Sequence, residues 1–252
     1  MMESIWLTGA SQGLGRALAL ELARQGFIVY ASARNQLALQ ELKQQALGQK
    51  LSGMIVPKPL DIEDAADVKT VLDSILSEGP IAKVILNAGT YQPVDASDFD
   101  CQSLRDLFQL NVFGTVNCLE PAVAALRKQG NGQIAIVASL AAYRGLPRSA
   151  AYGASKAALI HMAESLYTEL HRENVDIKVI NPGFVKTPLT DKNDFAMPQR
   201  VEAEWAAKHI ASKLSKPGFE IRFPTPFAQF MGFLKWLPYG IYFPLIRKIS
   251  NQ

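Results

Sequence analysis

Short apolar runs rich in β-branched residues alternate with longer helical patterns along most of this chain, and this alternation constrains its fold most strongly. Strands separated by crossover helices pair in parallel, and the helices then cover both faces of the sheet. The expected strands lie at 5–8, 27–30, 54–56, 83–86, 133–138, 177–180 and 219–223, and the expected helices at 14–24, 35–46, 64–76, 101–129, 149–173 and within 188–215. The pattern predicts a doubly wound α/β fold with a seven-stranded parallel sheet.

Length and composition indicate a single domain. With 252 residues, 48% of them hydrophobic, the chain can bury one substantial core. Neither a linker nor a low-complexity tract divides it. We therefore interpret 1–223 as the α/β domain and 224–252 as an aromatic-rich, apolar C-terminal extension of the same domain.

The charged and metal-ligating residues exclude several classes of function. The 26 Lys and Arg residues are interspersed with 23 Asp and Glu residues, so no nucleic-acid partner is expected. The three histidines lie far apart from one another and from both cysteines in the sequence, so no metal site is predicted. A secretory signal pattern is absent, and the apolar stretch 236–246 is too short to span a bilayer; a cytoplasmic location is expected.

A glycine-rich turn follows the first expected strand. Gly9, Gly13 and Gly15 have the spacing G-x-x-x-G-x-G, with Ser11, Gln12 and Leu14 between them. Glycines allow the backbone to approach a pyrophosphate closely, and the helix that begins here directs its N–H groups at that anion. By itself the spacing fits a ligand-free strand-to-helix turn equally well. Its place in the first βα unit favours dinucleotide binding.

The second expected strand indicates which dinucleotide binds. An acidic residue about 20 positions beyond the glycines binds the ribose 2′-hydroxyl of NAD, but no carboxylate occurs between Glu21 and Glu41. Arg34 follows this strand instead, and a guanidinium there can bind a 2′-phosphate with two hydrogen bonds. The alternative is an ordinary solvated arginine. The missing acid favours NADP(H) over NAD.

Tyr152 and Lys156 are four residues apart on an expected helix, so both can face one ligand. The lysine ammonium, together with an oxidised nicotinamide, would lower the pKa of the tyrosine and make it an acid/base near neutral pH. Ser139 lies at the carboxyl end of an expected strand, where ligands bind in such sheets. The Tyr-x-x-x-Lys spacing alone also occurs by chance.

Together these motifs resemble the short-chain dehydrogenase/reductase family, in its single-domain form with a Rossmann-like fold. The stretch 8–15 is similar to the family's TGxxxGxG turn, and the resemblance extends over residues 3–223. Further matches are Asp61 after the third strand, Asn87-Ala88-Gly89 for the family's NNAG with Leu86 in place of its first asparagine, Asn111, Ser139, Tyr152 with Lys156, and Pro182-Gly183 with Val185 and Thr187.

The resemblance implies hydride transfer between nicotinamide and a carbonyl or alcohol carbon. It assigns proton donation to Tyr152, the substrate oxygen to Ser139, the nicotinamide ribose to Lys156 and a bound water to Asn111. The implied cofactor contacts are Gly9, Ser11, Gln12, Gly13, Leu14, Gly15, Arg34, Asp61, Asn87, Ala88, Gly89, Tyr152, Lys156, Pro182, Gly183, Val185 and Thr187.

The sequence constrains the substrate and the oligomeric state less than it constrains the cofactor. Ser139, Tyr91 and Tyr143, with Leu140, are candidate substrate contacts, and the polar stretch 188–198 is a candidate lid. A small or lipophilic carbonyl or alcohol is expected, with a 3-oxoacyl thioester as the alternative. The resemblance implies a homodimer or homotetramer assembled through 101–129 and 149–173.

The C-terminal extension admits three interpretations. Phe227, Phe230, Leu234 and Leu237 recur at helical spacing, and Lys235, Arg247 and Lys248 accompany them. Such a helix can cover the core or an oligomer interface, form a wall for a lipophilic substrate, or lie on a membrane surface. A non-catalytic NADP-binding regulator or a membrane-surface protein therefore remains an alternative to the enzyme.

Overall fold

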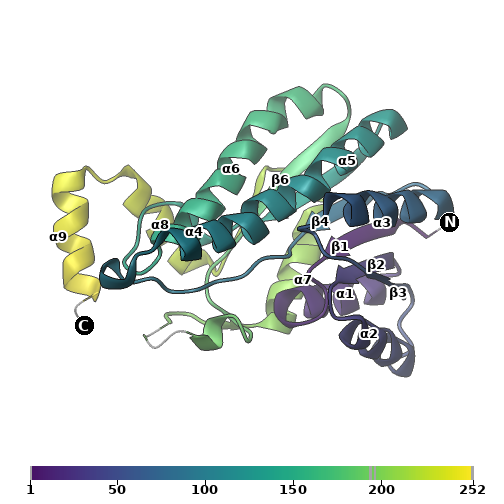
Figure 1. The fold of residues 1–252 in the computed structure, drawn as a ribbon, viewed down its shortest axis with the longest axis horizontal. Helices are drawn as coiled ribbons and strands as arrows, with labels where there is room; N and C mark the ends of the chain where they lie inside the picture. Colours follow the sequence, from purple (N-terminus) through teal and green to yellow (C-terminus); the bar gives the residue numbers. More distant parts are fainter. Residues whose placement is uncertain (1, 193–194, 196, 251–252) are drawn as a thin grey trace.

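The computed structural model describes residues 2–192, 195 and 197–250 (Figure 1). The described residues form a seven-stranded parallel sheet in the order β3-β2-β1-β4-β5-β6-β9. Its strands are β1 Ser4–Thr8, β2 Ile28–Ala33, β3 Met54–Pro59, β4 Lys83–Leu86, β5 Gly132–Val137, β6 Val175–Pro182 and β9 Glu220–Phe223. The predicted doubly wound α/β fold is thus confirmed.

Helices cover both faces of the sheet, as Figure 1 shows. The helices on one face are α1 Gly13–Arg24, α2 Gln36–Gly48 and α7 Ala203–Leu214, and those on the other are α3 Ala65–Glu78, α5 Gly114–Gln129 and α6 Ala150–His171. Alternate residues of a strand point to opposite faces. Ile5 and Leu7 therefore join the core under α1, whereas Trp6 joins the core under α3 and α5.

The order of the strands creates the crevice in which a site can form. From β1 the chain proceeds outward through β2 to β3, and it then returns to the other side of β1 to form β4, β5 and β6. The crossover connections on either side of the β1–β4 pair consequently run in opposite directions. Ligands in open α/β sheets bind at the carboxyl ends of the strands at such a switch point.

The single long helix expected at 101–129 is interrupted. The structure has α4 Cys101–Phe108, a π-helical segment Gln109–Phe113 and then α5. A π-helical turn inserts one residue into the helical repeat, and such turns are frequent at functional sites. The periodicity of apolar residues did not reveal this insertion, which contains Asn111.

The C-terminal extension forms two helices, α8 Thr225–Trp236 and α9 Tyr239–Ser250. Ala228, Met231, Leu234 and Tyr242 form a third apolar cluster with Leu140, which belongs to the short turn Leu140–Ala142 after β5. The extension therefore packs beside the carboxyl end of β5. Within the described residues, no helix has both the length and the apolar character needed to cross a membrane.

The remaining elements are short. Two two-residue strands, β7 Val185–Lys186 and β8 Val201–Glu202, pair in parallel outside the main sheet. The 3-10 turns Ala96–Asp98 and Thr190–Lys192 lie in loops on the carboxyl side of the sheet.

Replacing Gly15 by alanine should destabilise the fold, whereas the same replacement at Gly48 should not. A Cβ at Gly15 would lie 2.1 Å from the carbonyl oxygen of Gly9, but one at Gly48 meets nothing within 4 Å. We expect Gly15→Ala to lose about 1–3 kcal/mol of unfolding free energy through overpacking. Gly48→Ala, in α2, should gain up to about 1 kcal/mol because alanine favours a helix. Urea denaturation checks both, and equal stability of the two variants would contradict this account of the turn.

Candidate active site

The turn between β1 and α1 brings two stretches of backbone unusually close together. Gly9 and Gly13 adopt φ angles of +68° and +53°, a region that side chains with a Cβ rarely enter. The Gly9 carbonyl oxygen occupies the space that a Cβ of Gly15 would need. All three glycines of the motif are therefore required by the local backbone. The first turn of α1 lines the cavity, and the Gln12 side chain before it makes no capping hydrogen bond.

Asn87 and Thr8 tie this turn to the end of β4. The Asn87 side-chain amide donates hydrogen bonds to the carbonyl oxygens of Thr8, at 3.2 Å, and Gly9, at 3.1 Å. In return, the Thr8 hydroxyl accepts hydrogen bonds from the backbone N–H groups of Asn87, at 3.1 Å, and Ala88, at 3.2 Å. The β1–β4 crevice is thereby held in one shape.

Ser139, Tyr152 and Lys156 meet at the carboxyl end of β5. Ser139 follows β5, and the other two lie in the first turns of α6. A side-chain hydrogen bond joins Ser139 and Tyr152. The Lys156 ammonium donates a hydrogen bond of 2.9 Å to the carbonyl oxygen of Val137, at the end of the same strand.

The Asn111 side chain acts as a clamp that joins the loop after β4 to α6. Its amide oxygen accepts a hydrogen bond of 2.7 Å from the Thr90 N–H, and its amide nitrogen donates to the Thr90 carbonyl oxygen at 2.9 Å and to the Ser155 hydroxyl at 3.2 Å. A Cβ at Gly89 would lie 3.0 Å from the Asn111 amide oxygen and 3.2 Å from the Lys156 ammonium. The π-helical segment thus brings Asn111 between the loop after β4 and α6, next to Lys156.

Burial shifts the pKa values of both titratable groups toward their neutral forms. It lowers the pKa of Lys156 to about 8 and raises the pKa of Tyr152, although the hydrogen bond with Ser139 favours the tyrosinate. The lowered pKa that the sequence suggested for Tyr152 assumed an oxidised nicotinamide beside the lysine. The chain by itself keeps the proton on the phenol.

A cavity of about 430 Å³ extends from the glycine turn to these residues. Every cofactor contact implied by the sequence lines it, namely Gly9, Ser11, Gln12, Gly13, Leu14, Gly15, Arg34, Asp61, Asn87, Ala88, Gly89, Tyr152, Lys156, Pro182, Gly183, Val185 and Thr187, and so does Ser139. The glycine cradle, the start of α1 and the hydroxyl and amide groups along the cavity fit a nicotinamide dinucleotide.

Some residues that line the cavity were not named from the sequence. Ser32, Leu60 and Ile62 lie at or just beyond the carboxyl ends of β2 and β3, and Leu110 belongs to the π-helical segment. The position of the first three at strand ends was a usable signal. Leu110 carried none, because its orientation depends on the inserted helical residue.

Arg34 lies at the rim of the cavity. Its side chain is 64% exposed and forms an ion pair of 3.7 Å with Glu63. An exposed pair of this length contributes little energy. The guanidinium is therefore available for an anionic group at this end of the cavity.

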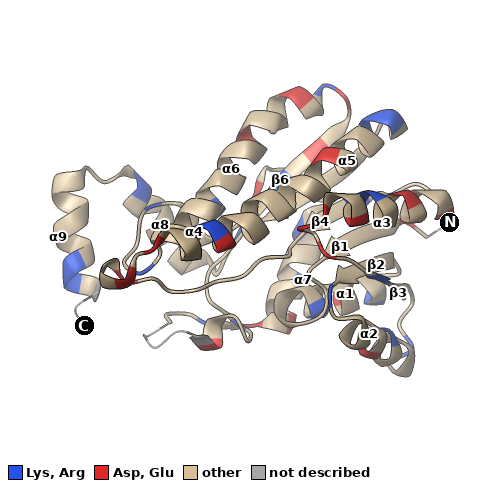
Figure 2. Ribbon diagram, in the orientation of Figure 1, with Lys and Arg blue, Asp and Glu red and all other residues tan. Residues whose placement is uncertain are grey.

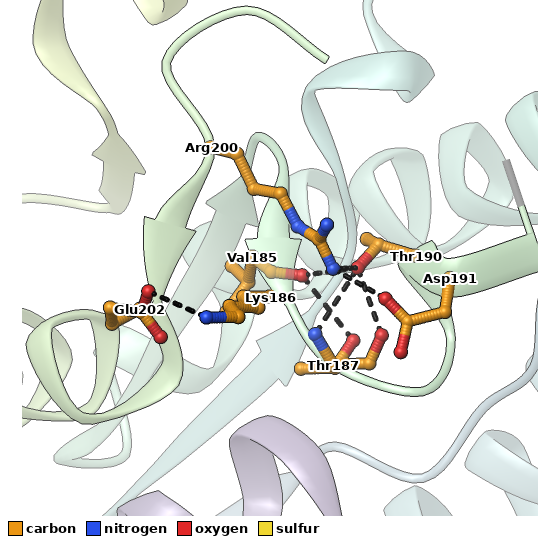
Figure 3. A network of polar contacts seen from close by, with 7 residues as sticks. All are labelled: Val185, Lys186, Thr187, Thr190, Asp191, Arg200 and Glu202. Carbon is orange, nitrogen blue, oxygen red and sulfur yellow. Dashed lines mark hydrogen bonds and ion pairs between the residues drawn. The ribbon is translucent and has the colours of Figure 1, made fainter. Parts of the chain in front are cut away.

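The segment around Thr187 is held by a compact polar network (Figure 3). The Thr190 hydroxyl donates to the carbonyl oxygen of Val185 at 2.7 Å and accepts a hydrogen bond of 3.1 Å from the Thr187 N–H. Arg200 contacts both Thr190 and Asp191, at 3.1 and 2.5 Å. These contacts hold Thr187 at the cavity wall. Of the candidate lid 188–198, residues 193–194 and 196 lie outside the described residues.

The three remaining candidate substrate contacts lie outside the lining of this cavity. The Tyr91 ring meets the Tyr152 ring edge-on, with centroids 5.0 Å apart. The Tyr143 hydroxyl donates a hydrogen bond to Glu220, and Tyr143 lines a second cavity between α6 and α8. Leu140 is buried against α8 and α9.

Comparison with known proteins adds independent findings. The family model described as short chain dehydrogenase matches residues 3–197. An uncharacterized oxidoreductase of Myxococcus xanthus is 34% identical over 244 residues, which are 96% of each chain. A 3-oxoacyl-[acyl-carrier-protein] reductase of Thermotoga maritima is 28% identical over 84% of each. The crystal structure of a short-chain dehydrogenase/reductase from Burkholderia phymatum in complex with NAD has a TM-score of 0.83, 20% identity and 92% coverage of both chains.

The buried Lys156 should make the stability of the protein rise with pH. Burial lowers its pKa from the usual 10.5 to about 8, so the unfolded chain binds the proton more tightly between these values. Burying the charged ammonium lowers the unfolding free energy. This loss applies in full below pH 8 and disappears as the pH rises toward 10.5. Relative to Lys156→Met, the wild type should gain about 2–3 kcal/mol of unfolding free energy between pH 7 and pH 10. Urea denaturation at both pH values measures it. Parallel pH profiles would show that the ammonium is not desolvated.

Proposed function

The chain belongs to the short-chain dehydrogenase family and is an oxidoreductase, and from this premise we propose that it interconverts a carbonyl and an alcohol with NADP(H). One observation carries the proposal: Ser139, Tyr152 and Lys156 meet in the same cavity that the glycine turn opens. A binding protein would need the turn but not the serine, the tyrosine and the lysine beside it.

The chain offers a binding group for each part of the cofactor. The backbone N–H groups at the start of α1 would bind the pyrophosphate, Asp61 would contact the adenine, and Thr187 would orient the carboxamide. The ammonium of Lys156 would bind the nicotinamide ribose hydroxyls after leaving the Val137 carbonyl oxygen. When bound, the nicotinamide supplies or accepts the hydride.

Ser139 and Tyr152 would act on the substrate oxygen. The Ser139 hydroxyl donates a hydrogen bond to that oxygen and stabilises the negative charge that develops on it during reduction. The Tyr152 hydroxyl then donates its proton to the oxygen. The raised pKa of Tyr152 keeps that proton on the phenol in the chain by itself, so the group is present as the acid that reduction requires. Lys156, with a pKa of about 8, is mostly charged at neutral pH and eases the loss of the proton.

Asn111 would act on this chemistry indirectly, through the residues around Lys156. Its side-chain amide holds Thr90 and Ser155, the residue next to Lys156. We propose that this clamp positions the ammonium, and that a water near Asn111 restores the proton of Tyr152.

Replacement of Tyr152 by phenylalanine tests the proton donor. We expect kcat to fall by about 10²–10⁴-fold, which is the usual contribution of a positioned general acid. The dissociation constant for NADPH should change by less than about twofold, because the ring is retained. Tyr167→Phe, on the same helix but packed against Phe219, is the matched control and should keep full activity. Turnover of Tyr152→Phe within tenfold of the wild type would remove Tyr152 as the acid.

The preference for NADP(H) rests on Arg34 and on the absence of an acid between Glu21 and Glu41. The guanidinium lies at the cavity rim, next to Ser32 and Ala33 at the end of β2. A 2′-phosphate would replace Glu63 as its partner, forming shorter, charge-assisted hydrogen bonds.

Arg34→Ala should weaken NADPH binding by about 10–100-fold, because a charge-assisted hydrogen bond contributes roughly 1.5–3 kcal/mol. NADH binding should be unchanged. The exposed Arg172→Ala serves as the control for the loss of one positive charge and should affect neither cofactor. Titration calorimetry measures the affinity of the wild type and of both variants for each of the two cofactors. Equal affinity of the wild type for NADPH and NADH would remove Arg34 as the selector.

For the substrate we propose a small or lipophilic free carbonyl compound. The Tyr91 ring, which meets the Tyr152 ring edge-on with centroids 5.0 Å apart, gives an apolar surface beside the proposed proton donor and supports this substrate class. The Thermotoga maritima reductase acts, by its name, on a 3-oxoacyl group held on a carrier protein. Assays with a medium-chain ketone and with acetoacetyl-coenzyme A, under the same conditions, separate the two classes.

We propose in addition that the chain assembles as a homodimer or homotetramer through α4, α5 and α6. The large side chain of Phe113, at the junction of the π-helical segment and α5, is 55% exposed and supports this surface. Removal of such a side chain from water would favour association.

A further inference from the structure

The helices α8 and α9 expose a group of large aromatic side chains. We call it the aromatic face; it consists of Phe230, Phe233, Trp236, Tyr239 and Phe243, which are 41%, 58%, 83%, 68% and 50% exposed. Ile241 and Ile249 lie on the same helical hairpin and are 57% and 47% exposed. Large exposed aromatic side chains gathered on two consecutive helices often mark a binding surface.

The pattern along α8 explains why these rings are exposed. Ala228, Met231 and Leu234 recur at intervals of three residues and are buried against Leu140. Phe230, Phe233 and Trp236 recur at the same interval, two residues further along, and face away from that cluster. The helix is therefore apolar on two sides, of which the protein covers only one.

The hairpin is firmly attached, so the aromatic face is a fixed feature of the fold. Tyr242 of α9 is 2% exposed, and its hydroxyl donates a hydrogen bond to the Gly145 carbonyl oxygen. The Arg144 guanidinium lies over the rings of Tyr239 and Tyr242, at 4.6 and 4.4 Å from their centroids. The rings of Tyr239 and Phe243 stack at 5.5 Å. In Figure 1, α9 stands at the end of the molecule that lies farthest from the N-terminus.

The charge of this segment is of one sign. Residues 223–252 contain Lys235, Arg247 and Lys248 but neither aspartate nor glutamate. Figure 2 shows α9 with blue and no red along its length. Two such faces of neighbouring copies would bring like charges together, whereas an anionic surface would be attracted.

We propose that the aromatic face of α8 and α9 docks the protein on an anionic lipid bilayer surface. Trp, Tyr and Phe side chains insert favourably at the level of the lipid headgroups, and neighbouring Lys and Arg side chains interact with acidic lipids. The protein would lie on the membrane without crossing it. Since the opposite side of α8 packs on Leu140, next to Ser139, docking would also bring the catalytic cavity close to a lipophilic substrate held in the bilayer.

Vesicle flotation with the full chain tests the proposal. The probes are vesicles of phosphatidylcholine alone and of phosphatidylcholine with one quarter phosphatidylglycerol. We expect binding to the anionic vesicles and at least tenfold weaker binding after the combined change Phe233→Ser, Trp236→Ser and Phe243→Ser. Leu37→Ser with Leu47→Ser, two exposed leucines of α2, is the matched control and should bind as the wild type does. Unchanged NADPH binding and melting temperature establish that each variant is folded.

Trp236 provides a direct optical readout. The chain has three tryptophans, of which Trp6 is buried and Trp205, in α7, is 46% exposed. In a Trp205→Phe background, addition of anionic vesicles should shift the tryptophan emission to shorter wavelengths, and brominated lipids should quench it. Adding Trp236→Phe should abolish both responses.

The charge is tested separately. Lys248→Glu should weaken binding to the anionic vesicles severalfold, while Lys128→Glu, at the end of α5, leaves it unchanged. Two results would overturn the proposal. One is that the wild type does not bind the anionic vesicles, or that the triple serine variant binds them as tightly as the wild type does. The other is sedimentation showing that the triple variant converts an oligomer into a monomer while vesicles do not bind, because the occupant would then be a second copy of the chain.

Discussion

The crevice that contains the site depends on one set of hydrogen bonds between the ends of β1 and β4. Thr8 accepts two backbone hydrogen bonds from the loop after β4, and Asn87 donates two to the glycine turn. They join the turn, in which the Gly9 carbonyl oxygen lies 2.1 Å from the Cβ position of Gly15, to the loop that contains Gly89, beside Asn111 and Lys156. The two ends of the cavity, at the glycine turn and beside Lys156, are therefore joined by one set of hydrogen bonds.

Burial at the carboxyl end of β5 determines the chemistry of the site. The same desolvation that lowers the pKa of Lys156 to about 8 raises the pKa of Tyr152, so both groups approach their neutral forms. A lysine in this environment costs stability, and such costs are typical of groups retained for function. The π-helical segment contributes to the arrangement because it directs Asn111 toward Thr90 and Ser155.

Much of the architecture was predictable because it is local. The alternation of apolar runs and helical patterns located every strand of the main sheet, and the cofactor residues inferred by resemblance all line one cavity. Interruption of the helix at Gln109–Phe113 was missed, since one inserted residue leaves the apolar periodicity on either side intact. The second helix of the extension was missed because Pro238 and Pro244 obscure its pattern. Tyr143, close to Ser139 in sequence, instead faces Glu220.

The sequence by itself determined the fold class, the glycine turn and the spacing of Tyr152 and Lys156, because each is set by residues near one another along the chain. Only the tertiary structure decided that Tyr143 contacts Glu220 and that Leu140 packs against α8 and α9. It also decided that Asn111 binds the loop after β4 and that the aromatic side of α8 stays exposed. These outcomes depend on contacts between elements far apart in sequence. Packing energy selects among them, and no local pattern records that choice.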